Sequence, residues 1–335
     1  MTPKNRIIPI FVPHLGCPND CVFCNQRRIS GRMTPATPET VKAELSKALS
    51  LLPPEQTAEI AFYGGSFTAI PEKEQGALLS AAQPYLASGR IHGIRVSTRP
   101  DCIDGETIDR LRKYGVKTVE LGAQSMDETV LRLSGRGHTG EDVRKAAKML
   151  KDAGFHLILQ MMTGLPGDTA EKSLKTAEEL IALQPDGVRV YPTVIVKDTR
   201  LYDMWKAGVY KEHTVQDAVS VCAKLSRLFQ NAGISVIRMG LNPTEDLSHG
   251  DAVGGAYHPA FGELVRSQIY LEEMCALLEG RELKGGVTFG VAKGQISAAV
   301  GQKRCNIQYI SQKYGVKPVK ITEIDIKVGK VILID

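Results

Sequence analysis

The sequence predicts an α/β fold, in which parallel strands form a partial (β/α)6 barrel followed by a small C-terminal α+β appendage. Six short apolar runs before residue 192 each end in polar or glycine-containing residues, and helical patterns separate them. Strands that alternate with helices of about 10–15 residues imply a parallel sheet. Six such units are fewer than the eight of a closed barrel. The composition then shifts near Gly280, where the appendage begins.

The elements follow in chain order. The six predicted strands are residues 6–13, 58–63, 91–98, 117–122, 155–162 and 186–191. Between them a helix is predicted over 38–52, with Thr37 as N-cap and Pro38 at the first helical position. Further predicted helices are 141–153, 170–183, 198–208, 214–232 and 263–278, with an irregular stretch over 238–259. We expect three regions: a barrel over 1–242, a loop and helix extension over 243–280, and a β-α-β-β appendage over 281–335.

The composition limits the class of protein. The chain has 335 residues, of which 43% are hydrophobic and 24% charged, as in ordinary soluble globular proteins. No apolar run approaches the roughly 18 residues of a membrane span, and the polar start, Met1 to Arg6, does not resemble a signal peptide. Seven cysteines, three of them clustered, favour a reducing cytoplasm and metal binding over disulfides. The net charge of +5 is compatible with a nucleic-acid partner without demanding one.

The most informative motif is a CxxxCxxC run, Cys17, Cys21 and Cys24, just after the first strand. Thiolates select zinc, Cu(I) or iron–sulfur clusters. Structural zinc takes four ligands, and here the remaining cysteines stand singly, at 102, 222, 275 and 305. Three thiolates on a four-iron cluster leave one iron without a protein ligand. Two alternatives stay open: a zinc site with His14 as fourth ligand, and cysteines that serve only as small buried hydrophobes.

This spacing, with Phe23 before the last cysteine, resembles the radical SAM superfamily. The resemblance implies a 4Fe-4S cluster on the three cysteines, with its open iron chelated by the amino and carboxylate groups of S-adenosylmethionine. It also implies reductive cleavage of that cofactor to a 5′-deoxyadenosyl radical, with an external one-electron donor of the flavodoxin or ferredoxin type. Phe23 is expected to pack against the cluster.

The resemblance extends to polar residues at the ends of later strands. Gly64, Gly65 and Ser66 match the glycine motif at the methionine end of the cofactor, although many members have Glu where this chain has Ser66. The other cofactor-binding residues that it implies are Thr98, Asp101 and Gln124 for the ribose and carboxylate, Arg136 for the carboxylate, Gln160, and Leu165 for the adenine. Each of these polar residues could instead form hydrogen bonds with backbone groups at the strand ends or be exposed to solvent.

Three further groups of residues have two interpretations each. Tyr191, at the end of the sixth strand, is a candidate catalytic residue on the substrate side or a buried tyrosine with a bonded hydroxyl. His138 could move a proton or cap its loop. Basic residues occur after the cysteine loop and in the appendage, where they could bind phosphates or simply face solvent; they are Arg27, Arg28, Arg32, Lys303, Arg304, Lys313, Lys317 and Lys320.

The chain also contains the segments FYGGSFTAIP, STRPD, VELGAQS, GRGHT and PDGVRVYPTVIVKDTRLYDMWKAGVY. These segments resemble the radical SAM half of the catalytic subunit of Elongator, whose family begins carboxymethylation of the tRNA wobble uridine. This chain has a shorter spacing between its first two cysteines, and residues 281–335 are too few for an acetyltransferase domain, so we expect any acyl group to come from a partner. The predicted function is therefore a cytoplasmic radical SAM enzyme that modifies a base in tRNA or another RNA. The alternatives are a coproporphyrinogen oxidase-like enzyme on a small molecule and a non-catalytic zinc–RNA module.

Overall fold

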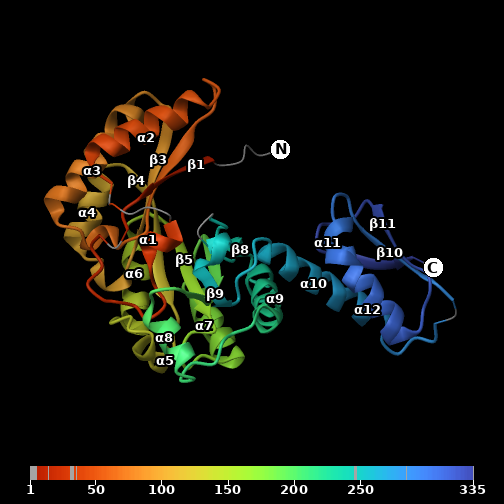
Figure 1. Cartoon of the computed structure of the whole chain (residues 1–335). Helices are drawn as coiled ribbons and strands as arrows, with labels where there is room; N and C mark the ends of the chain where they lie inside the picture. Colours follow the sequence, from red (N-terminus) through yellow and green to blue (C-terminus); the bar gives the residue numbers. More distant parts are fainter. Residues whose placement is uncertain are drawn as a thin grey trace.

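The computed structural model describes residues 6–13, 15–30, 34, 36–244, 247–283 and 285–334, with only the backbone of residue 27. Its main feature is a curled sheet of seven strands in the order β1-β2-β3-β4-β5-β6-β8, in which every neighbouring pair is parallel (Figure 1). The strands are β1 (Arg6–Phe11), β2 (Ala58–Tyr63), β3 (Ile91–Thr98), β4 (Val116–Gln124), β5 (His156–Thr163), β6 (Gly187–Pro192) and β8 (Ser235–Met239). The predicted partial barrel is thus confirmed.

Helices cover the outer face of this half-barrel (Figure 1). They are α2 (Pro38–Ser50), α3 (Glu72–Ala87), α4 (Gly105–Lys113), α6 (Gly140–Asp152), α7 (Ala170–Ala182) and α9 (Val215–Asn231), with the short helices α1 (Gln26–Ser30), α5 (Glu128–Leu133) and α8 (Arg200–Lys206) in the loops. Helix α2 begins as predicted, because Thr37 and Thr40 form a reciprocal capping box in front of Pro38. None of the helices in the described ranges is long and apolar enough to cross a lipid bilayer.

The sheet has one strand more than the six that the sequence predicts. The extra strand, β8, is an edge strand with no fully buried residue, so its sequence lacks the apolar run that marks a central strand. The stretch that we expected to be irregular also contains a π-helical turn (Leu247–Asp251) and the strand β9 (Ala252–Gly255). Strand β9 pairs in antiparallel fashion with β7 (Val194–Val196), at the mouth of the barrel.

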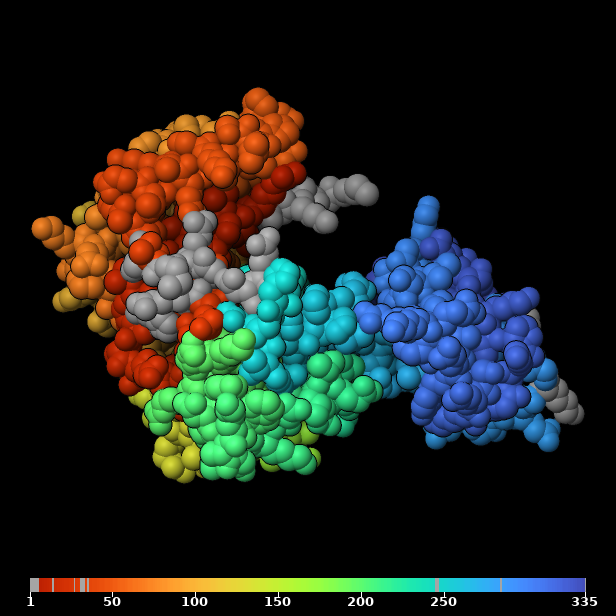
Figure 2. All heavy atoms as spheres, viewed as in Figure 1, coloured from red at the N-terminus to blue at the C-terminus, as the bar shows by residue number. Residues whose placement is uncertain are grey.

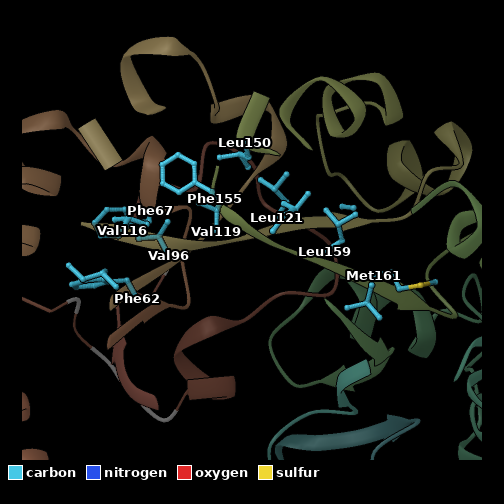
Figure 3. Packing of buried hydrophobic residues seen from close by; sticks show 14 of the residues in the cluster. Phe62, Phe67, Val96, Val116, Val119, Leu121, Leu150, Phe155, Leu159 and Met161 are labelled. Carbon is cyan, nitrogen blue, oxygen red and sulfur yellow. The ribbon is translucent and has the colours of Figure 1, made fainter. Parts of the chain in front are cut away.

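The two faces of the sheet differ in polarity because side chains alternate along each strand. On β4, Val119 and Leu121 are fully buried in the apolar core beneath the helices, whereas Glu120 and Gly122 face the concave side. Figure 3 shows Leu150 of α6 in one layer with Val119, Leu121 and Leu159 of the strands. The apolar core therefore lies outside the sheet, and the inside is left for polar chemistry.

The C-terminal residues form a separate lobe at the end of helix α10 (Phe261–Leu278), as Figures 1 and 2 show. Its elements are β10 (Val287–Ala292), α11 (Ile296–Val300), α12 (Cys305–Tyr314), β11 (Val319–Ile324) and β12 (Val331–Ile334), which matches the predicted β-α-β-β order with one added helical turn. Strand β10 is central, parallel to β11 and antiparallel to β12. Helix α10 joins the two bodies, because Phe261 and Val265 belong to the barrel core and Met274 and Leu278 to the core of the lobe.

Candidate functional site

A cavity of about 460 Å³ opens on the concave side of the sheet, at the C-terminal ends of the strands. Polar groups from separate strands converge there because parallel strands end at the same rim. Of the fourteen predicted site residues, twelve line the cavity: Cys17, Cys21, Phe23, Cys24, Gly64, Gly65, Ser66, Thr98, Gln124, Arg136, Gln160 and Tyr191. Asp101 and Leu165 are not among its lining residues.

The three clustered cysteines come from one loop, between β1 and α1, and are all reduced. Burial is the main cause that raises the pKa of Cys24 to about 12, and the neighbouring thiols Cys21 and Cys17 raise it further. Burial likewise raises the pKa of Cys17, with Cys21 again contributing. Thiols that influence one another in this way hold their protons until a metal displaces them. The donor set therefore fits a thiolate-ligated metal group.

A single zinc ion and an iron–sulfur cluster need different arrangements of their thiolate ligands. Within the described part of the chain, no three His, Cys, Asp or Glu side chains form a group that could hold one metal ion. An iron–sulfur cluster, by contrast, distributes its thiolate ligands over several iron atoms. His14, the predicted fourth zinc ligand, lies outside the described residues.

Arg136 lies behind the cysteine loop as a buried cation. Its Nη1 donates to Cys21 Sγ at 3.2 Å and its Nη2 to the Gly122 carbonyl at 2.8 Å. Its Nε is buried and has no hydrogen-bond partner, and among the described residues no carboxylate pairs with the guanidinium. A buried charge without a counter-ion is unfavourable unless an anion binds beside it. Arg136 therefore suits a site that receives negative charge, such as a ligand carboxylate or a thiolate-ligated cluster.

Close backbone contacts fix the cysteine loop in place. Gly137 has φ +73°, and a Cβ there would lie 2.3 Å from Asn19 Nδ2, which itself donates to the Arg136 carbonyl at 3.2 Å. On the other side, a Cβ at Gly65 would lie 2.4 Å from the Leu15 carbonyl oxygen. The glycines thus allow the loops after β1, β2 and α5 to meet at the rim.

The strand-end residues divide into cavity-facing and structural groups. Gln160 Nε2 donates to Gln124 Oε1 at 3.2 Å, and both amides line the cavity. Thr98 Oγ1 is engaged by Ser66 Oγ at 3.0 Å and by Thr68 Oγ1 at 2.6 Å, so it mainly holds the loop after β2. Ser66 also accepts from the Arg99 backbone N–H at 3.3 Å. Thr98 and Ser66 thus hold the loop after β2, whereas the two glutamines contact each other at the cavity wall.

Asp101 lies outside the cavity because it pairs with its neighbour. Arg99 donates from Nε and Nη2 to the two Asp101 oxygens, each at 2.9 Å, and Arg99 itself lines the cavity. Arg99 Nη2 also donates to the Arg136 carbonyl at 2.5 Å. Leu165 is 2% exposed in the apolar interior. Asp101 thus positions Arg99. Because neither Asp101 nor Leu165 lines the cavity, the predicted cofactor contacts of these two residues have no support from its lining.

Sequence reasoning missed a charged network at the floor of the cavity. Glu120 Oε1 accepts hydrogen bonds from Arg95 Nη1 at 2.6 Å, Arg189 Nη2 at 2.9 Å and the Tyr63 hydroxyl at 3.1 Å. Arg189 Nη1 donates to the Tyr191 hydroxyl at 3.3 Å. Burial raises the pKa of Tyr191, although Arg189 opposes the shift, so the tyrosine stays protonated. The missed signal was a single charged residue inside each of several apolar strand runs.

Two of the remaining predicted residues have structural partners. His138 is 4% exposed, and its Nε2 faces the Ala123 carbonyl at 3.1 Å. Burial is the main cause that lowers its pKa to about 4, and the Arg136 charge adds to it. His138 therefore caps its loop and does not line the cavity. Arg28 donates to both Asp251 oxygens at 2.9 Å and pairs with Asp198, while Arg32 and the Arg27 side chain lie outside the described residues.

The chain resembles curated proteins over about half of its length. The curated tRNA uridine(34) acetyltransferase of Methanocaldococcus infernus is 35% identical over 157 residues, which are 46% of this chain and 29% of that protein. Human Elongator complex protein 3 is 31% identical over 190 residues, 51% of this chain and 35% of the relative. The chain thus spans about a third of the length of the curated relatives that it matches.

Solved structures show the same fold. The archaeal Elp3 of M. infernus, with an N-terminal deletion, has a TM-score of 0.63 at 24% identity and covers 81% of this chain and 63% of its own. Coproporphyrinogen III oxidase (HemN) from Escherichia coli has a TM-score of 0.51 at 18% identity over 69% of this chain and 54% of its own. The family model of the Radical_SAM C-terminal domain matches residues 185–271, and that of the Radical SAM superfamily matches residues 11–180, half of the chain, so this protein belongs to the radical SAM superfamily.

Proposed function

We propose that this chain binds a 4Fe-4S cluster through Cys17, Cys21 and Cys24, binds S-adenosylmethionine in the adjoining cavity, and modifies a base of RNA, with tRNA as the substrate class. The observation that carries the proposal is the convergence of three thiols from one loop on a cavity backed by the buried Arg136. When bound, the cluster supplies the electron that cleaves the sulfonium of the cofactor to a 5′-deoxyadenosyl radical.

The residues of the chain bind and orient the cofactor. Arg136 has one guanidinium edge committed to Cys21 and Gly122 and a buried Nε still unpaired, which suits the cofactor carboxylate. Gly64, with φ +91°, leaves the strand end open to a close approach of the methionine end. Gln124 and Gln160 present an amide pair to the ribose and adenine side. Phe23 supplies apolar surface beside the cysteines.

The charged floor of the cavity belongs to the substrate side in this proposal. Arg189 and Tyr191 offer donors at the end of β6, and Arg238 adds a cation from the edge strand β8. These groups suit a polar base or phosphate better than an apolar substrate. The open edges of the half-barrel, at β1 and β8, give a large polymer access that a closed barrel would deny.

The named activities of the relatives support the RNA part. Two curated relatives above 30% identity are a tRNA uridine(34) acetyltransferase and an Elongator complex protein 3. We assign delivery of the electron to a flavodoxin- or ferredoxin-type donor, and delivery of any acyl group to a partner protein. The likeness to HemN is one of fold.

The test begins with anaerobic reconstitution of the full chain, followed by iron and sulfide analysis and assay of 5′-deoxyadenosine with dithionite. Nucleoside mass spectrometry then compares RNA from cells with and without the gene. We expect a cluster, cofactor cleavage and one missing modified nucleoside. A colourless zinc protein would overturn the radical chemistry. Cofactor cleavage stimulated by coproporphyrinogen and unaffected by tRNA would overturn the RNA part.

A further inference from the structure

The C-terminal lobe has the order strand, helix, tight turn, helix, strand. Strand β10 leads into α11, a turn over residues 301–304 joins α11 to α12, and β11 returns in parallel beside β10. The turn begins with a glycine, Gly301. This arrangement is typical of K-homology modules, in which a four-residue turn between two helices clamps the backbone of about four nucleotides. In such modules the fourth turn residue is also glycine, whereas this chain has Arg304.

The surplus of positive charge that gives the protein its net charge lies in the lobe. Residues 286–334 contain eight Lys and Arg residues against two carboxylates, a surplus of six, whereas the net charge of the entire chain is +5. All eight basic side chains are exposed, and none of them forms an ion pair within the described residues. A small unit with this charge attracts polyanions. The barrel, in contrast, is close to neutral.

The turn itself is held in a fixed shape. Lys303 and Arg304 both have left-handed backbones, with φ of +51° and +62°, and both side chains are exposed. The buried Asn306 anchors the turn, because its Nδ2 donates to the Ala299 carbonyl at 3.0 Å and to the Ser267 carbonyl at 2.9 Å. A Cβ at Gly301 would lie 2.5 Å from Cys305 Sγ. The charged side chains of Lys303 and Arg304 are thus exposed on a turn that the buried Asn306 holds in place.

Helix α11, which leads into the turn, lies on the side of the lobe toward the barrel (Figure 1). Its anchor, Ser267, is on α10, and α10 begins at Phe261, which packs against Gly240 just after β8. The six residues from Phe261 to Ser267 span about 9 Å along the helix axis. Leu241 and Asn242, which follow Gly240, line the catalytic cavity. The anchor of the turn is therefore about two turns of α10 away from the residue that packs against the end of β8, next to the cavity-lining Leu241.

We propose that the turn Gly301–Arg304 binds the phosphate backbone of single-stranded RNA and holds it beside the mouth of the barrel. The proposal deepens the RNA-modifying function proposed above and rests on it for the identity of the polymer. Lys303 and Arg304 contact phosphates, while the exposed Ile296 of α11 and Tyr309 of α12 provide apolar surface for bases. The lobe supplies affinity for the chain of the RNA, and the barrel performs the chemistry.

The test measures binding of a fluorescein-labelled, unstructured twelve-nucleotide RNA to the full chain by anisotropy over a range of salt concentrations. The test variant is Lys303→Glu with Arg304→Glu. The matched control is Lys327→Glu with Lys330→Glu, which makes the same change of charge in the same lobe, in the segment between β11 and β12. A third variant, Arg304→Gly, removes the guanidinium and gives the left-handed position the residue that adopts it most readily.

We expect the test variant to bind at least about tenfold more weakly and to lower the salt slope by about 1.4, the value for two phosphate contacts on a single strand. The control should change affinity by less than about threefold, and Arg304→Gly should fold normally and bind more weakly. Cofactor cleavage without RNA should be the same in all variants.

Three results would overturn the inference. If the test and control variants weaken RNA binding equally, the effect depends on the net charge of the lobe and not on the turn. If the test variant and Arg304→Gly both bind RNA as tightly as the wild type, the RNA site does not include this turn, and the proposed function is unaffected. Absence of RNA binding by the wild-type chain, with cofactor cleavage intact, would remove the RNA part of the proposed function itself and this inference with it.

Discussion

Arg136 Nη1 lies 3.2 Å from Cys21 Sγ, although the two residues are 115 positions apart in the sequence. The contact joins the turn after α5 to the cysteine loop and places a buried positive charge behind the thiols. The same guanidinium holds the Gly122 carbonyl at the end of β4. One side chain therefore ties the metal-ligating loop to the rim of the sheet.

Replacement of Arg136 by Gln should lower the rate of S-adenosylmethionine cleavage by about 10- to 100-fold, the effect of losing a charged hydrogen bond of 1.5–3 kcal/mol. Iron content should stay near that of the wild type, because the three thiols remain. The matched control is Arg132→Gln, an exposed arginine on α5. A cleavage rate within threefold of the wild type would argue against a cofactor contact.

Replacement of Cys21 by Ala should abolish both the brown iron–sulfur absorbance and cofactor cleavage. The reason is that two thiolates cannot hold a cluster that needs at least three protein ligands with one site open. Cys305→Ala, an exposed thiol in the lobe, serves as control and should retain both properties. Iron bound by Cys21→Ala at wild-type stoichiometry would contradict the ligand assignment.

Gly137→Ala should destabilise the protein more than Gly89→Ala, although both glycines have φ +73°. The left-handed backbone costs about 1–2 kcal/mol in either variant. Only at Gly137 would the new Cβ also meet a neighbour, Asn19, because nothing lies within 4 Å of a Cβ at Gly89. Urea denaturation should show an additional loss of about 1–3 kcal/mol for Gly137→Ala. Equal losses would mean that the two loops do not pack as described.

The sequence was sufficient to predict most of the barrel and twelve of the residues that line the cavity. Apolar runs identified β1 to β6. Residues at or just after the ends of these runs, such as Ser66, Gln124 and Tyr191, had to gather because parallel strands share one rim. Thr37 before α2 and Pro38 at its first position gave the helix start, because Thr37 caps the helix and proline suits its first turn. These features depend on local sequence and on strand direction, both of which a sequence contains.

Features that depend on pairing between distant residues could not be predicted. In the STRPD segment the sequence does not say whether Arg99 or Asp101 faces the cavity, and the structure has Arg99 there, with Asp101 as its partner. The Glu120 network joins strands that are far apart in the chain, so no spacing reveals it. Strand β8 was not predicted because an exposed edge strand needs no apolar run.

The buried imidazole of His138 should make the protein lose stability as the pH falls. Its pKa in the folded state is lowered from 6.5 to about 4, chiefly by burial, so the folded state resists a proton that the unfolded chain accepts. This stability is fully present above about pH 6.5 and is lost as the pH falls toward about 4. Between about pH 7 and pH 5 the loss is about 2 kcal/mol.

The check is thermal unfolding of the wild type and of His138→Gln at both pH values. Gln can still donate to the Ala123 carbonyl but does not titrate. The variant should therefore show a smaller drop in melting temperature on acidification. Identical drops would show that other groups dominate the acid sensitivity.

Glu120→Gln should destabilise the protein by about 3–5 kcal/mol, because it removes the carboxylate that compensates two buried guanidinium groups. Arg95 would keep Glu59 as a partner at 2.8 Å, but Arg189 has no other carboxylate within the described residues. The exposed Glu72, which pairs with Arg110, provides the control: Glu72→Gln should change the free energy of unfolding by less than about 1 kcal/mol. A loss of stability for Glu120→Gln no larger than that of the control would mean that solvent compensates the charge of Arg189. The floor of the cavity would then be too hydrated to act as a preorganised substrate site.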